Sequence, residues 1–203
     1  MGEIKEENLV YLFIKHHAID MNDNRTNDMI EQVISNTPLF LCNAHERLPS
    51  LDKMGGDWDL IMKLIETRKV FYSRLYKNRV TYLSNELYWC MKSYKQRWEK
   101  LSQTSQKVFG FLDGFGEATT PEIKNILLLS DKTFAKCINE LTKELFITAV
   151  AKERQINNNW SSFYWGTYKL WEQTAKKCPS DSQDIYTILA PIFSEREIQQ
   201  LLK

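Results

Sequence analysis

The sequence predicts a mainly helical protein with small β-hairpins, an α+β fold that includes a winged helix-turn-helix, which is expected to occur in tandem. Only seven Gly and five Pro among 203 residues argue against a turn-rich all-β fold. Apolar residues recur at three- and four-residue spacing over most of the chain, which is typical of amphipathic helices. In the second half, two helical segments separated by a short turn precede two strand-like segments, and this order predicts the winged helix.

The first third of the chain predicts helices joined by polar segments. Residues 6–19 have an apolar face at helical spacing, and a second helix begins near Thr26 and ends before Pro38. Residues 38–56 show no clean period and are expected to form a loop. Asp57 is a suitable N-cap for a helix that continues to Glu66.

The middle of the chain predicts a hairpin followed by a long helix. Residues 70–83 are rich in β-branched and aromatic side chains, with Lys77-Asn78 as the turn. Ser84 can cap the next helix, whose apolar stripe consists of Leu87, Met91, Tyr94, Trp98 and Leu101. The other faces of this helix are expected to carry Lys92, Lys95, Arg97 and Lys100.

The helix-turn-helix has clear start and stop signals. A short helix around residues 108–112 ends at Gly114 and Gly116, and Thr119 with Glu122 then forms a capping box for a helix that buries Ile123, Ile126 and Leu127. After the turn at 128–130, Ser130 caps a helix whose inner stripe is Phe134, Ile138, Leu141 and Leu145. Residues 146–151 and 163–170 are expected to form the two strands of the wing.

In such a fold the second helix of the motif enters the major groove of DNA. Lys132, Lys136 and Lys143 are candidates for phosphate contacts, and Thr133 and Asn139 for contacts with base edges. The wing adds Arg154 and Asn158. Glu140 and Glu144 lie on the same helix and would repel phosphates if they faced the groove. The alternative is that these lysines only form a solvated helix face.

Charge is distributed unevenly, although the net charge is +1. Residues 67–110 hold ten Lys/Arg against two Asp/Glu, and residues 1–66 hold six against twelve. The basic middle adds Arg74, Lys77 and Arg79 to the candidate polyanion-binding residues. We predict three regions: an N-terminal helical region with a hairpin (1–100), the winged helix-turn-helix (101–175) and C-terminal helices (176–203).

Other features predict a cytoplasmic protein without a cofactor or a metal. The chain shows no signal-peptide pattern and no apolar run near the roughly 20 residues that span a membrane. Cys42 and His45 have metal-like spacing, with His16 and His17 as conceivable partners, but a structural zinc site needs paired short spacings. Incidental placement is the simpler interpretation. Aromatic residues 163–171 form either core or a stacking platform for bases, and core is favoured.

Several segments resemble the AlkZ-related proteins, winged-helix relatives of the bacterial DNA glycosylase AlkZ. They are Pro38-Leu39-Phe40 with Leu48-Pro49-Ser50-Leu51, Asp57-Trp58, the stretches 69–76 and 80–84, and Phe163-Tyr164-Trp165-Gly166. The resemblance implies tandem winged-helix units and DNA as the ancestral ligand. The glycosylase uses a Gln-x-Gln motif that this sequence lacks, because Gln103 and Gln106 are three apart and Gln199 and Gln200 are adjacent.

Three functional hypotheses remain open at this point. The first is a non-enzymatic protein that binds double-stranded DNA, with a regulatory or repair-associated role. The second is a protein-interaction module on a winged-helix scaffold, in which the acidic and basic regions pair with each other or across a homodimer. The third is a DNA glycosylase-like repair activity, for which the sequence nominates no catalytic residue.

Overall fold

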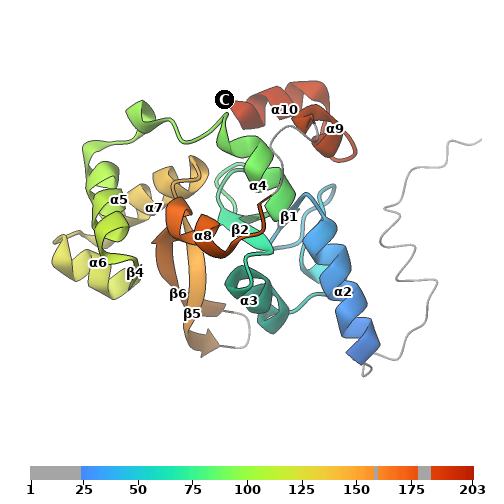
Figure 1. The fold of residues 1–203 in the computed structure, drawn as a ribbon, viewed down its shortest axis with the longest axis horizontal. Coiled ribbons are helices and arrows are strands. Elements are labelled where there is room, and N and C mark those ends of the chain that lie inside the picture. The colour runs from blue at the N-terminus through green and yellow to red at the C-terminus, as the bar shows by residue number, and fades with distance from the viewer. Residues whose placement is uncertain (1–23, 158–159, 178–183) are drawn as a thin grey trace, which may run out of the picture.

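The protein is a mixed α+β molecule, as predicted. The computed structural model describes residues 24–157, 160–177 and 184–203 (Figure 1). The helix expected over residues 6–19 lies outside these ranges. Within them, no helix has the length and apolar character that a membrane crossing requires.

The first half of the described chain holds α2, β1, a 3₁₀ turn η1, α3 and the hairpin β2–β3. The bounds are α2 Asn24–Asn36, β1 Leu39–Leu41, η1 Asp52–Met54, α3 Trp58–Glu66, β2 Val70–Ser73 and β3 Thr81–Ser84. The sheet is antiparallel with the order β1-β3-β2. Residues 38–56 are therefore only partly a loop, because Leu39–Leu41 pairs with β3 as an edge strand that is too short to show a period.

The second half repeats this order of elements. The bounds are α5 Gln103–Phe115, β4 Glu117–Thr119, α6 Thr120–Ile126, α7 Asp131–Lys143, β5 Ile147–Asn157 and β6 Trp160–Thr167. Its antiparallel sheet has the order β4-β6-β5. In both halves a helix, a short edge strand, two helical segments and a hairpin follow one another, and the edge strand pairs with the last strand of the hairpin.

Four helices and a 3₁₀ turn complete the described chain. They are α4 Asn85–Lys92, η2 Trp98–Lys100, α8 Tyr168–Thr174, α9 Ile185–Leu189 and α10 Glu195–Leu202. The two short helices expected near the C-terminus are thus present. The second wing strand ends at Thr167 rather than near Leu170, because the Thr167 side chain caps α8 by accepting a hydrogen bond from the Leu170 N–H.

The prediction of one long helix from Ser84 to Leu101 is wrong. The helix α4 ends at Lys92, and Gln96 adopts a left-handed backbone conformation with φ of 58° that an α-helix does not accept. Trp98 belongs to η2, where its ring contacts Phe109 and Phe146 at centroid distances of 5.5 and 5.7 Å. The regular apolar stripe therefore spans two separate elements that pack against different neighbours.

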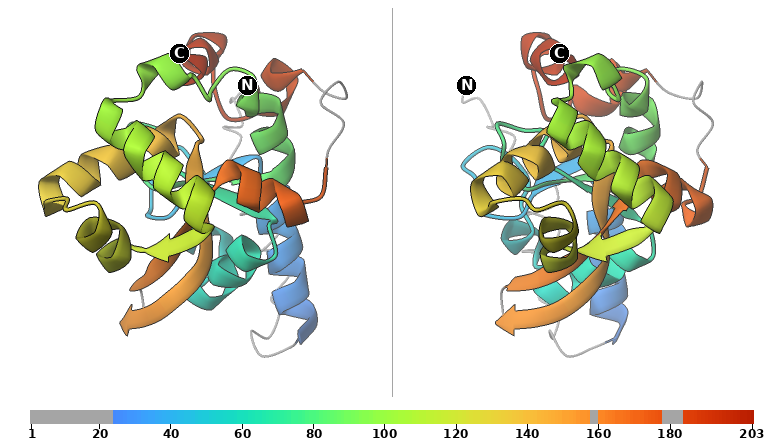
Figure 2. Two further views of the ribbon diagram at one scale, coloured as in Figure 1. Left: turned by 60° about the vertical axis from the view of Figure 1, so that its left-hand side comes forward. Right: turned by 90° about the vertical axis from the view of Figure 1, so that its left-hand side faces the viewer.

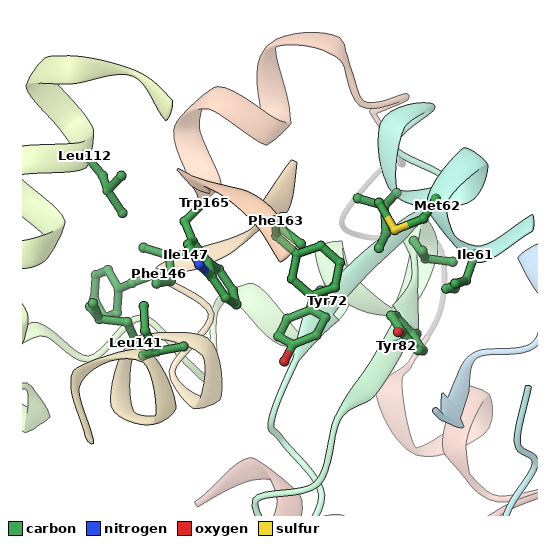
Figure 3. Close-up of a cluster of buried hydrophobic side chains, with 14 of the residues drawn as sticks. Ile61, Met62, Tyr72, Tyr82, Leu112, Leu141, Phe146, Ile147, Phe163 and Trp165 are labelled. Carbon is green, nitrogen blue, oxygen red and sulfur yellow. The ribbon is translucent and has the colours of Figure 1, made fainter. Parts of the chain in front are cut away.

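One hydrophobic cluster joins the two halves. Tyr72 of the first sheet lies 5.5 Å from both Phe163 and Trp165 of the second, measured between ring centroids (Figure 3). Burial of Phe163 and Trp165 confirms that these aromatic residues are core. A second cluster stacks Phe71 on Tyr88 at 4.4 Å and lies beneath α9 and α10.

Candidate nucleic-acid interface

The helix α7 is fixed by its cap and by its apolar stripe. The Ser130 hydroxyl accepts a hydrogen bond from the Thr133 N–H at 3.2 Å, as predicted. Phe134, Ile138 and Leu141 are buried against the rest of the second half. Because these residues are three or four apart, the intervening positions are left on the opposite face of the helix. The stripe thus determines which side of α7 meets solvent.

The predicted phosphate-binding lysines lie on that solvent face. Lys132, Lys136 and Lys143 are all exposed. Across the described ranges, neither Lys132 nor Lys143 forms an ion pair, and Lys136 approaches Glu140 only at 3.9 Å while its side chain stays 73% exposed. An ion pair of this length and exposure is weak. The three positive charges are therefore available to an external anion.

Glu140 does not oppose that charge, because its carboxylate faces the start of α5. One oxygen, Oε2, accepts hydrogen bonds from the Ser102 N–H at 3.2 Å and from the Ser102 and Ser105 hydroxyls at 2.7 Å each. Burial works to raise the pKa of Glu140, but these hydrogen bonds outweigh it and hold the pKa below its ordinary value. The carboxylate thus stays ionised while it stabilises the N-terminus of a neighbouring helix.

Glu144, which ends α7, is also turned inward. Its residue is 7% exposed, its carboxylate accepts from the Arg97 guanidinium at 3.3 Å, and its carbonyl accepts from the Gln96 N–H at 2.9 Å. Both glutamates at the C-terminal half of α7 therefore bind partners within the protein, whereas Asp131 at its first residue is 91% exposed and pairs with Lys124. The charges of α7 are sorted, with glutamates toward the core and lysines toward solvent.

The two candidates for base-edge contacts are less free than the lysines. Thr133 is half-buried, and its hydroxyl lies 2.9 Å from the Ser130 Oγ. Asn139 is half-buried as well, and its Oδ1 is buried without a hydrogen-bond partner. Lys132, Lys136 and Thr133 also line an open pocket of about 330 Å³ against the start of α5, whose further lining residues are Ser102, Thr104 and Cys137.

The hairpin candidates are placed in different surroundings. Arg154 is exposed on β5, whereas Asn158 lies outside the described residues. Lys77 is exposed at the β2–β3 turn, as predicted, with a left-handed φ of 49°. Arg74 and Arg79 are half-buried, and Arg79 donates to the Ala44 carbonyl at 3.2 Å.

The β2–β3 loop packs toward the C-terminal helices. The ring of Tyr76 in this loop lies 5.8 Å from that of Phe193, between centroids, and Arg47 forms a 2.5 Å ion pair with Glu197 on α10. In the described parts of the chain, Arg74, Lys77 and Arg79 form no hydrogen bond or ion pair with a residue of α7. The three lysines therefore share the solvent face of α7, and the cations of the β2–β3 hairpin are not part of that face.

The basic residues that the sequence placed on a long solvated helix form a separate cluster. Lys95 is 4% exposed, so its expected position on a solvent-facing surface is wrong. It lies within the electrostatic field of Arg97, Lys100 and Lys143, together with the carboxylate of Glu144. Residues 93–97 could not be recognised as the link to α7, because nothing in the local pattern marks the left-handed turn at Gln96.

The counterpart of α7 in the first half is α3, and it is covered. The indole of Trp58 lies 6.1 Å from the ring of Phe163, and Lys152 on β5 pairs with Asp59 at 3.6 Å while its N–H donates to Glu66 at 3.2 Å. The exposed side chains of α3 are mostly acidic: Asp59, Lys63 and Glu66. Figure 1 shows the strands β5 and β6 beside α3.

Cys42 and His45 are not joined by a third metal-ligating side chain in the part of the chain that the structure describes. No three His, Cys, Asp or Glu residues gather there in a way that could hold a metal ion. His16 and His17 fall outside the described residues. Burial raises the pKa of the Cys42 thiol, which keeps it protonated rather than ready to ligate.

Comparison with known proteins gives one match. The family model described as "AlkZ related" matches residues 41–203, which include α3, the hairpin β2–β3, the whole second sheet, α7 and the C-terminal helices. No curated protein and no solved structure matches the chain.

Proposed function

Because the chain belongs to the AlkZ-related family, we propose that it binds double-stranded DNA without chemically altering it and uses α7 as its contact helix. The observation that carries this proposal is the sorting of charge on α7. Lys132, Lys136 and Lys143 face solvent, while the carboxylates of Glu140 and Glu144 bind partners inside the protein. Such a face attracts the phosphates of DNA, and the exposed acid at the first residue of α7, Asp131, is paired with Lys124.

The element order supports a winged helix as the binding unit. In the sequence α5, β4, α6, α7, β5 and β6, the helix after the turn is α7 and the hairpin after it is the wing. Figure 2 shows α6 and α7 on one side of the β5–β6 hairpin. In this proposal α7 enters the major groove, and its lysines position the protein on the backbone. The first half is a second, degenerate unit.

Only the second unit binds DNA in this proposal. Its α7 is open, whereas α3 is covered by β5 and presents Asp59 and Glu66 to solvent. The half-buried Asn139 and Thr133 offer few donors to base edges, so affinity rests on phosphate contacts. We therefore expect weak dependence on sequence and strong dependence on salt.

The test is fluorescence anisotropy with a labelled random duplex at several salt concentrations. For the wild type, log Kobs should fall linearly with log salt, with a slope near 0.9 for each phosphate contacted. The triple variant Lys132→Gln/Lys136→Gln/Lys143→Gln should lose about three units of that slope and at least about tenfold in affinity.

A charge-matched control separates a specific surface from net charge. Lys176→Gln/Lys177→Gln/Arg196→Gln removes three exposed positive charges that lie after α8 and on α10. This control should keep the wild-type slope. If both triple variants lose the same slope, the role of α7 is wrong. If the wild type does not bind, and light scattering shows a salt-sensitive dimer, the protein-interaction hypothesis is favoured instead.

The chemistry of the α7 pocket favours binding over base excision. Excision requires a flipped nucleotide to be stacked and held in a snug pocket. The pocket beside α7 is open, and its lining of Ser102, Thr104, Lys132, Thr133, Lys136 and Cys137 includes no aromatic side chain and no carboxylate. We expect no abasic product when the protein is incubated with an alkylated duplex.

A further inference from the structure

The pocket beside α7 is formed by two helices, α5 and α7, that pack against each other (Figure 1). Its volume of about 330 Å³ lies at the lower end of the range of roughly 300 to 1,000 Å³ that is usual for ligand sites. Its lining comes from the start of α5 and the first half of α7: Ser102, Thr104, Lys132, Thr133, Lys136 and Cys137. These side chains carry two ammonium groups and three hydroxyl groups, which are donors to an oxyanion.

The charge at this pocket is positive. In the described parts of the chain Lys132 forms no ion pair, and the Lys136 ammonium lies 3.9 Å from Oε1 of Glu140. Burial raises the pKa of the Cys137 thiol, so this side chain is neutral at pH 7 and adds no negative charge. The carboxylate of Asp131, at the first residue of α7, is paired with a lysine of α6. Two ammonium groups therefore act against the single carboxylate of Glu140.

The three hydroxyl groups of the pocket differ in whether they are already engaged. The Ser102 hydroxyl donates to Glu140 at 2.7 Å, and the Thr133 hydroxyl lies 2.9 Å from the Ser130 Oγ. The hydroxyl of Thr104 forms no hydrogen bond with any residue that the structure describes, and its residue is half-buried. Thr104 therefore offers a free donor on the α5 side of a pocket whose other side carries two lysines.

The spacing of the two lysines fits more than one phosphate. Lys132 and Lys136 are one helical turn apart, which brings their Cβ atoms to about 5 to 6 Å from each other. Two long side chains at this spacing can meet neighbouring phosphates of one DNA strand, and Ser and Thr hydroxyls also contact phosphate oxygens. The pocket has the volume of about eleven water molecules in the liquid, which is more than a phosphate group alone requires.

We propose that this pocket holds a segment of the sugar–phosphate backbone of one DNA strand, with neighbouring phosphates on Lys132 and Lys136 and the Thr104 hydroxyl donating to one of them. The site rests on the proposed function and deepens it, because it makes the start of α5 a second contact with DNA. A backbone gripped by two helices fixes the orientation of α7 in the groove. Lys143 lies roughly 16 Å farther along α7 than Lys132, at 1.5 Å per residue, and contacts a different part of the backbone.

The variant Thr104→Glu tests the site, because its carboxylate would pair with the two lysines and repel phosphates. Fluorescence anisotropy with a labelled random duplex should show a loss of affinity of at least about tenfold at an ionic strength of about 0.15 M. The matched control Gln103→Glu makes the same change of charge at the preceding, exposed residue of α5, which does not line the pocket. Because salt screens a charge outside the pocket, this control should lose less than about threefold.

A second variant, Thr104→Val, separates the hydroxyl from the charge and covers the case in which Thr104→Glu does not fold. It keeps the shape of the side chain and should lose about fivefold in duplex affinity, because a hydrogen bond to a charged oxygen is lost. Its salt slope should equal that of the wild type, since no charge has changed. A Thr104→Val variant with wild-type affinity overturns the site. So do equal losses of affinity for Thr104→Glu and Gln103→Glu.

The lysine variants show whether the proposed function fails together with the site. If Lys132→Gln/Lys136→Gln/Lys143→Gln loses the expected salt slope while Thr104→Val binds as the wild type does, α7 contacts DNA and the pocket holds no backbone. If the wild type binds no duplex at all, the proposed function is contradicted and the site falls with it.

Duplexes of one length, with and without 5′-phosphates, distinguish an internal segment of the backbone from the end of a strand. The wild type should bind both with equal affinity. A gain of more than about fivefold on phosphorylation, lost in Thr104→Val, would assign the pocket to a terminal phosphate and overturn its assignment to internal backbone.

Discussion

A single side chain, Lys95, links the stability of this protein to pH. Its residue is 4% exposed, and the charges of Arg97, Lys143 and Lys100 oppose that of its amine while the carboxylate of Glu144 favours it. Burial lowers its pKa from 10.5 to about 8, because the protein interior solvates the charged form poorly. In the unfolded chain the amine regains its ordinary pKa, so folding opposes its protonation.

The direction of the resulting pH dependence follows from linkage. Between about pH 8 and 10.5 the unfolded state binds more protons at this site than the folded state, so stability contributed by Lys95 rises with pH across that window. Below pH 8 both states are protonated and the penalty is constant at about 3 kcal/mol. Lys95→Met should therefore be more stable than the wild type at pH 7, by a margin that shrinks toward pH 10.5.

Urea unfolding of both proteins in chloride buffer at pH 7, 8, 9 and 10 measures this margin. The contributions of most other titrating groups cancel in the difference between the two free energies of unfolding. The control Lys107→Gln should show no such trend. A margin that stays constant from pH 7 to 10 would contradict the assigned environment of Lys95.

For single residues, the sequence predicts which side chains of α7 face solvent but not which residues its glutamates bind. The stripe from Phe134 to Leu145 correctly places Lys132, Lys136 and Lys143 in solvent. It could not show that Glu140 and Glu144 turn inward, because their partners Ser102, Ser105, Gln96 and Arg97 lie about 35 to 50 residues earlier in the chain. Ile126 was expected to be buried and is 55% exposed, since α6 ends there and its last turn extends beyond the core.

Two leucines follow the helices α6 and α7 in the same backbone conformation. Leu128 after α6 has φ of 53°, and Leu145 after α7 has φ of 57°. This left-handed region costs an L-residue about 1 kcal/mol or more. The two differ in burial, because Leu128 is 90% exposed and Leu145 is fully buried.

Replacement by Asn, which tolerates this conformation better, should therefore act oppositely at the two positions. Leu128→Asn should raise the free energy of unfolding by about 0.5 to 1 kcal/mol, because it relieves strain and loses no packing. Leu145→Asn should lower it by more than about 3 kcal/mol, because a polar amide replaces a core side chain. Denaturant titration of both variants measures this, and a destabilised Leu128→Asn would contradict the assignment of strain.

Helix starts were predictable, and helix lengths were not. Asp57, Ser84, Ser130 and the Thr119 capping box all act as the sequence indicates. Their signal is local, since a cap contacts N–H groups two or three residues away. The end of α4 and the strand β1 depend on distant contacts instead: Gln96 after α4 bonds to Glu144 at the end of α7, and β1 pairs with β3.

Buried hydrogen bonds join the first sheet of the molecule to the second. The Thr148 hydroxyl on β5 accepts from the Tyr72 N–H at 2.9 Å and donates to the Tyr72 carbonyl at 3.1 Å, and both residues are buried. Arg68, at the end of α3, donates to the Val150 carbonyl at 2.5 Å. The two halves therefore share hydrogen bonds as well as a core.

Thr148→Val tests this junction, because it keeps the shape of the side chain and leaves the Tyr72 backbone unsatisfied. It should lower the free energy of unfolding by about 2 to 3 kcal/mol. The control Thr142→Val removes an equally buried hydroxyl that bonds within its own helix, to the Ile138 carbonyl at 2.6 Å, and should cost less than about 1 kcal/mol. Circular dichroism and tryptophan fluorescence should still report one coincident transition. Equal losses for the two variants would contradict the importance of the junction.

The cover that β5 places over α3 limits the form of any DNA target. A protein with two equivalent reading helices can span successive turns of the groove and favours inverted repeats. Here α3 packs against β5 and its exposed side chains are mostly acidic, so of the two helices only α7 is proposed to contact DNA and a monomer has no internal dyad to match. A nuclease-protection footprint should accordingly be short and asymmetric, without palindromic character.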